Sequence, residues 1–143
     1  MNDWMEMVKR IEQELVSGLR ENRTLRQVVS ELSEKYSYGD IITVLERGAK
    51  IGVVFIYCRG GSAYRAYDVF RIGSFYYALR ADVGDCGEGK YDPLAYDSPS
   101  LREVVASVLS GVIADDIYFI SPSLAVYAPF PVPEDRMRGP RSR

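Results

Sequence analysis

Arginine and tyrosine side chains alternate with apolar residues in the segment from Ile51 to Arg80, IGVVFIYCRGGSAYRAYDVFRIGSFYYALR. Residues 59–80 hold four arginines and one carboxylate, Asp68, whereas the formal net charge of the whole chain is -2. Guanidinium groups pair with phosphates, and aromatic rings stack on nucleobases. The segment therefore predicts a local patch that binds single-stranded nucleic acid on an otherwise acidic protein.

Several kinds of catalysis are excluded by composition. The chain has no histidine, which removes nucleophiles activated by imidazole and imidazole bases. Its two cysteines, Cys58 and Cys86, are too few for a metal cluster, and whether they form a disulfide stays open. We expect a protein that is not an enzyme and holds no cofactor. A metal-dependent nuclease that uses Asp85, Asp115 and Asp116 is a remaining alternative.

Two glycine-containing turns divide this segment into three strands. Gly60-Gly61 and Gly73-Ser74 have the form of two-residue hairpin loops, because glycine adopts positive φ at little cost. Such loops fix the register of the strands. The register predicts that Tyr67 lies opposite Val54 in one pair and opposite Arg80 in the other.

The same register assigns each side chain to a face of the sheet. One face is predicted to be the core, interrupted by Asp68; it holds Ile51, Val53, Phe55, Tyr57, Tyr64, Ala66, Phe70, Ile72, Phe75, Tyr77 and Leu79. The other is predicted to bind nucleic acid through Val54, Ile56, Arg65, Tyr67, Val69, Arg71, Tyr76 and Arg80, with Arg59 at the rim. Tyr67 and Tyr76 would stack bases, and the arginines would contact phosphates. A protein–protein interface or an ordinary solvated sheet face is also compatible with this composition.

Helical spacing of apolar residues predicts helices over residues 3–20, 24–35, 40–47 and 100–111. Thr24 with Gln27 and Ser100 with Glu103 have the form of capping boxes at the start of the second and fourth helices. Two further strands are predicted over 117–120 and 124–127. We therefore expect an α+β fold, in which three N-terminal helices and one C-terminal helix pack on one face of a roughly five-stranded, mainly antiparallel sheet. The helix order also fits a winged helix-turn-helix protein that binds double-stranded DNA. Against this alternative, Asp40 and Glu46 would face the phosphates from the recognition helix.

Chain length predicts a single domain over residues 1–128, followed by a tail over 129–143 that is first proline-rich and then basic. No apolar run approaches the roughly 18 residues of a membrane span. Asp3 and Glu6 at the N-terminus are unlike a signal peptide. We expect a cytoplasmic protein with no membrane partner.

N-terminal helices, the stretch IYCRGGSAYRAYDVFRIGSFYYALR, and a following helix with further strands together resemble the archaeal ThermoDBP family and its related proteins from thermophiles. The resemblance covers most of the chain. It implies an antiparallel sheet with a hydrophobic cleft edged by basic residues, single-stranded DNA or RNA as the ligand, and a homo-oligomer such as a homodimer. No short motif transfers binding residues one by one. The chain also lacks an extended C-terminal heptad helix, so coiled-coil dimerisation is not implied.

Overall fold

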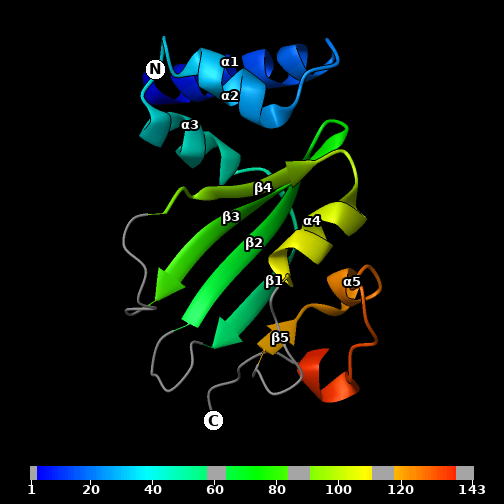
Figure 1. Cartoon of the computed structure of the whole chain (residues 1–143). Coiled ribbons are helices and arrows are strands. Elements are labelled where there is room, and N and C mark those ends of the chain that lie inside the picture. The colour runs from blue at the N-terminus through cyan, green and yellow to red at the C-terminus, as the bar shows by residue number, and fades with distance from the viewer. Residues whose placement is uncertain (1–2, 58–63, 84–90, 111–117, 138–143) are drawn as a thin grey trace.

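A five-stranded antiparallel sheet forms the centre of the molecule in the computed structural model, which describes residues 3–57, 64–83, 91–110 and 118–137 (Figure 1). The strands are β1 (Ala49–Tyr57), β2 (Tyr64–Ile72), β3 (Phe75–Val83), β4 (Leu94–Ser98) and β5 (Tyr118–Ile120), in the order β4-β3-β2-β1-β5. The helices are α1 (Asp3–Leu19), α2 (Leu25–Leu32), α3 (Tyr38–Leu45), α4 (Leu101–Val108), α5 (Pro122–Ala125) and the 3₁₀ helix η1 (Glu134–Met137). The predicted α+β class is confirmed.

The register of the three central strands agrees with the sequence prediction. Tyr67 pairs with Val54 on one side and with Arg80 on the other. Gly73, with φ of 56°, forms the turn between β2 and β3. The turn between β1 and β2 lies outside the described residues. A bulge between Lys50 and Gly52 interrupts the start of β1.

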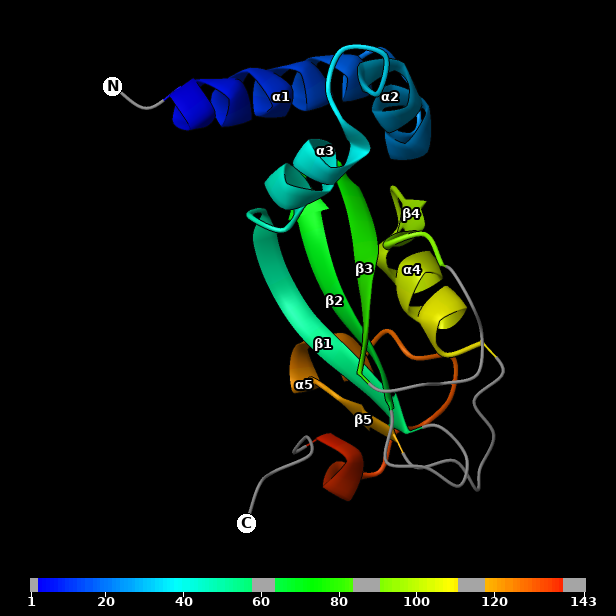
Figure 2. The same ribbon diagram turned by 90° about the vertical axis from the view of Figure 1, so that its left-hand side faces the viewer.

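Helices lie on both faces of the sheet, so the prediction that they share one face is wrong (Figure 2). Helices α1 to α3 pack against Phe70, Tyr77 and Leu79 at the end of the sheet where β1 begins. Helices α4 and α5 cover Val54 and Val69 on the opposite face. The reason is that these strands carry apolar side chains on both faces, and each face requires an apolar partner layer.

Side-chain caps set the start of three helices. Thr24 and Gln27 form the predicted capping box of α2, and the Ser37 side chain accepts the Asp40 N–H at the start of α3. The Ser100 side chain accepts the Glu103 N–H at the start of α4. The box predicted there is only half formed, because the Glu103 carboxylate accepts the Ser98 hydroxyl instead.

Three predictions for the C-terminal half are corrected. The sequence prediction lacked strand β4, which has only five residues, LAYDS. Residues 124–127 were predicted to form a strand, yet helix α5 begins at Pro122 and ends at Ala125, since proline is favourable in the first helical turn. Residues 129–137 are not a separate tail: Phe130, Val132 and Met137 pack against the core, so the fold extends beyond residue 128. Among the described residues, no helix has the length and apolarity to cross a membrane.

Candidate functional site

Most of the apolar and aromatic residues predicted to stack bases are buried. Val54 and Val69 are 0% exposed, and Ile56 and Tyr67 are 2% exposed. They pack beneath α4 and α5, where Val104, Val105 and Leu124 are also buried. The prediction that these four residues line an exposed binding surface is therefore wrong.

The remaining predicted residues are not gathered into one exposed patch. Tyr76 is partly buried against the same core, Arg65 is partly buried, and Arg71 is exposed near the end of β2. Arg80 donates to both carboxylate oxygens of Asp82, from Nε at 2.9 Å and from Nη2 at 2.7 Å. Its charge is therefore already compensated. Arg59 lies outside the described residues.

An open cleft of about 430 Å³ lies beside Arg80. Its lining consists of Arg26, Tyr67, Arg80, Tyr91, Asp92, Leu94, Ala95 and Tyr96. The Arg80 guanidinium lies 4.6 Å from the Tyr91 ring centroid, and Arg26 lies 3.0 Å from Asp92. Both guanidinium groups thus have a carboxylate partner, which a phosphate would have to displace. This cleft combines arginine and tyrosine side chains without offering an unpaired cation.

Tyr38 borders the same carboxylate. Its hydroxyl donates to Asp92. Partial burial, followed by this hydrogen bond, raises the pKa of Tyr38 to about 12. The tyrosine therefore stays neutral near pH 7 and serves to hold β4 against the N-terminal helices.

A second aromatic surface lies on the opposite face of the sheet. Phe55 and Tyr57 of β1, Tyr64 of β2 and Phe119 of β5 are all partly buried. Their rings form a continuous chain of edge contacts: the centroids of Phe55 and Tyr64 are 5.3 Å apart, those of Tyr64 and Tyr57 are 5.8 Å apart, and those of Tyr57 and Phe119 are 6.1 Å apart. We call these four residues the aromatic face.

Among the described residues, α1 to α3 cover only one end of the face that carries these rings, and the rings stay partly exposed (Figure 2). Tyr77 marks the covered end: it is 0% exposed, and its hydroxyl donates to the Leu45 carbonyl of α3 at 2.7 Å. The ends of β1 and β2 that carry Tyr57 and Tyr64 extend beyond these helices (Figure 2). Sequence alternation correctly placed Phe55, Tyr57 and Tyr64 on the same side as Tyr77 but assigned all three to the core. It assigned Phe119 to neither face.

Among the described residues, Lys50 and Asp68 form an ion pair on this side of the sheet. Lys50 Nζ lies 3.3 Å from Asp68 Oδ1, with both side chains partly exposed. Within the described part of the chain, no group of three or more potential ligands is placed to hold a metal ion. Asp85, Asp115 and Asp116, the residues of the nuclease alternative, lie outside it.

No protein-family model matches the chain, and no curated protein or solved structure is significantly similar to it. The resemblance to the ThermoDBP family therefore stays a prediction. The geometry of the aromatic face is therefore the basis for a functional proposal.

Proposed function

We propose that the protein binds single-stranded DNA or RNA on the aromatic face and has no catalytic activity. The observation that supports this proposal is the row of four partly exposed rings on three neighbouring strands. Aromatic side chains on an open sheet take up unstacked bases, because every nucleobase has a π-face. This mode of binding gives little sequence preference.

Electrostatics near the face are compatible with a polyanion. Asp68 is the carboxylate at its margin, and Lys50 compensates its charge. Arg59, predicted at the rim of the opposite face, stands between Tyr57 and Tyr64 in the sequence and lies outside the described residues. With so few cations, we expect stacking to supply most of the affinity and phosphate contacts to supply a modest salt dependence.

A second candidate function is association with another copy of the chain through the same face. The matched pair of Lys50 and Asp68 favours it, because a two-fold axis would place each charge near the opposite charge of the other copy. Aromatic residues are also enriched at protein interfaces. In this case the ligand would be the second protomer rather than a nucleic acid.

Fluorescence anisotropy of labelled single-stranded DNA and RNA, measured over a salt series, tests the proposal. The decisive variant is Tyr57→Ala/Tyr64→Ala, which removes two rings of the aromatic face. Its matched control is Tyr76→Ala/Tyr127→Ala, which also removes two partly buried tyrosines. These two pack against the core on the opposite face of the sheet, around Val54 and Val69. Thermal unfolding of both variants verifies that each remains folded.

We expect the wild type to bind with an affinity that falls as salt rises. Loss of each stacked ring should weaken binding about five- to 150-fold, and the control should bind like the wild type. Absence of binding at low salt, together with a concentration-dependent dimer that the Tyr57→Ala/Tyr64→Ala variant disrupts, would favour the second candidate function instead.

A further inference from the structure

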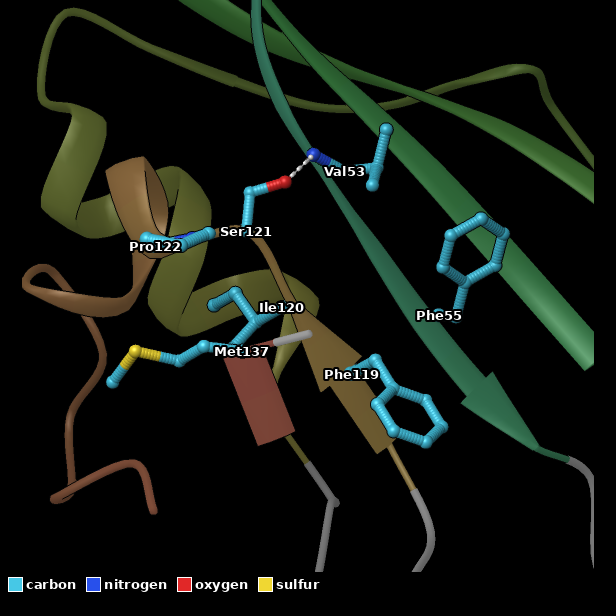
Figure 3. A pocket seen from close by; sticks show the side chains of 7 residues that line it. All are labelled: Val53, Phe55, Phe119, Ile120, Ser121, Pro122 and Met137. Atoms are coloured by element: carbon cyan, nitrogen blue, oxygen red, sulfur yellow. Dashed lines mark hydrogen bonds between the residues drawn. The ribbon is translucent and has the colours of Figure 1, made fainter. Parts of the chain in front are cut away.

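A pocket of about 230 Å³ opens beside the aromatic face (Figure 3). It lies among β1, β5, the start of α5 and the end of η1, and it is lined by Val53, Phe55, Phe119, Ile120, Ser121, Pro122 and Met137. Phe55 and Phe119 are paired directly across the two strands, and they belong to both the pocket and the aromatic face. A strand stacked on the rings would therefore pass the mouth of the pocket.

Size and lining of the pocket suit one planar ring. Apolar cavities of about 150 Å³ already hold benzene. Six of the seven lining residues are apolar, and Met137 supplies a flexible thioether that adapts to the shape of an aromatic ligand. The pocket is smaller than the roughly 300–1,000 Å³ of sites that enclose a whole drug-sized ligand.

One polar group in the pocket can orient a bound ligand. The Ser121 Oγ accepts the Val53 N–H at 2.9 Å (Figure 3). A hydroxyl has one proton to donate in addition to its acceptor sites. The Ser121 O–H can therefore donate to a carbonyl oxygen or ring nitrogen at the edge of a bound base.

The pocket is held open by the way the chain leaves β5. The Ser121 N–H donates to the Val53 carbonyl, and the Ser123 hydroxyl donates to the Ile51 carbonyl at 2.8 Å. These side-chain and backbone bonds continue the pairing with β1 after β5 ends. They also fix the first turn of α5 as a wall of the pocket.

From these features we infer that the pocket receives one unstacked nucleobase of the bound strand, while neighbouring bases stack on the aromatic face. This inference rests on the proposed function. Unstacked bases of single strands are splayed out, stacked on rings and hydrogen-bonded at their edges. The pocket combines these three elements in one place, through Phe55, Phe119 and Ser121. An apolar side chain of a protein partner is the occupant that the experiment below must exclude.

Photo-crosslinking distinguishes the pocket from the aromatic face. The probe is oligothymidine with one thiothymidine, irradiated with the full-length protein at a concentration that saturates binding, and the crosslinked peptides are mapped by mass spectrometry. Val53→Phe adds a ring at the pocket. Its control, Ser74→Phe, adds the same ring at an exposed position in the turn between β2 and β3, at the other end of the strands from Tyr57 and Tyr64 and outside the pocket lining.

We expect crosslinks to Met137, Pro122 or Ser121 in addition to those on Tyr57 and Tyr64. Val53→Phe should remove the pocket crosslinks and weaken binding about fivefold or more, whereas Ser74→Phe should change neither. Crosslinks to Tyr57 and Tyr64 with none in the pocket would overturn this inference and leave the proposed function intact. Absence of any binding would overturn both.

Discussion

The two faces of β1 and β2 carry similar side chains but have different surroundings. Val54 and Tyr67 lie on one face and are nearly inaccessible beneath α4 and α5. Phe55 and Tyr64 lie on the other face of the same strands and remain partly exposed. Neither the apolar content nor the strand pairing separates these faces. They differ in whether a later segment of the chain packs on them.

This difference shows where a binding surface can arise in such a fold. The N-terminal helices cover the end of one face, and the segment after β4 covers the other face. What remains is the far end of the first face, where aromatic rings contact one another in place of a helix. An open row of rings of this kind is costly to leave in water and is typical of a surface with a partner.

The largest expected effect comes from truncating Tyr67, which lies on the buried face. Tyr67→Ala should lower the free energy of unfolding by about 3–5 kcal/mol, as expected for an aromatic side chain in a core. Tyr64→Ala should cost about 1 kcal/mol, because much of its contact surface is already exposed. Urea unfolding of both variants measures this. Equal losses for the two variants would contradict the contrast between the faces.

How much of this contrast could be predicted from sequence depends on the range of the interactions. The Gly73 turn and the Thr24 cap are local, and their prediction was correct. Alternation in β1 and β2 separated the side chains into the two correct sets except for Ile51, which packs with the Val54 face because a bulge interrupts β1 between Lys50 and Gly52. It did not reveal which set would be covered, because the cover comes from α4, α5 and η1, far along the chain.

Lengths of the elements contained a signal that the sequence reasoning missed. Strands of nine residues span about 30 Å, whereas helices of eight residues span about 12 Å. Helix α3, which meets the sheet at Tyr77, therefore cannot cover the whole face of these strands, and the longer α1 packs on α2 and α3. The aromatic pair of Tyr57 and Tyr64, at the end of the meander farthest from α3, was the place to expect an open surface.

The covered end of the face gives the next prediction. Tyr77→Phe should lower the free energy of unfolding by about 1–2 kcal/mol, because it removes the donor to the buried Leu45 carbonyl and leaves the ring in place. Binding of single-stranded nucleic acid should be unchanged, since Tyr77 is remote from the open rings. Parallel urea unfolding and anisotropy test both parts. A large loss of binding would mean that the covered and open ends are coupled.

The pH dependence of stability at alkaline pH tests the burial of Tyr67 and Tyr77. Burial raises the pKa of Tyr67 and of Tyr77 above the value of about 10 for an exposed tyrosine. The unfolded chain then loses these protons first, so stability is complete below about pH 10 and falls as pH rises through the raised values. Urea unfolding between about pH 9 and pH 12 measures the slope. Tyr67→Phe should flatten it, and an unchanged slope would contradict the assignment.

The smallest expected effect concerns the ion pair at the boundary between the covered and open ends. Lys50→Gln should change the free energy of unfolding by no more than about 1 kcal/mol, because both partners are partly exposed. It should slightly weaken nucleic-acid binding at low salt by leaving the Asp68 charge uncompensated. Asp68→Asn in the same background should restore the affinity. If Asp68→Asn does not restore the affinity, Lys50 does not act on binding through its ion pair with Asp68.

A nuclear magnetic resonance titration with labelled tyrosine rings tests the central claim most directly, because it reports both faces in one experiment. Addition of a single-stranded oligonucleotide should shift the ring signals of Tyr57 and Tyr64 and leave those of Tyr67 and Tyr76 unchanged. Shifts at Tyr67 and Tyr76, with Tyr57 and Tyr64 unaffected, would contradict the account and return the site to the face beneath α4.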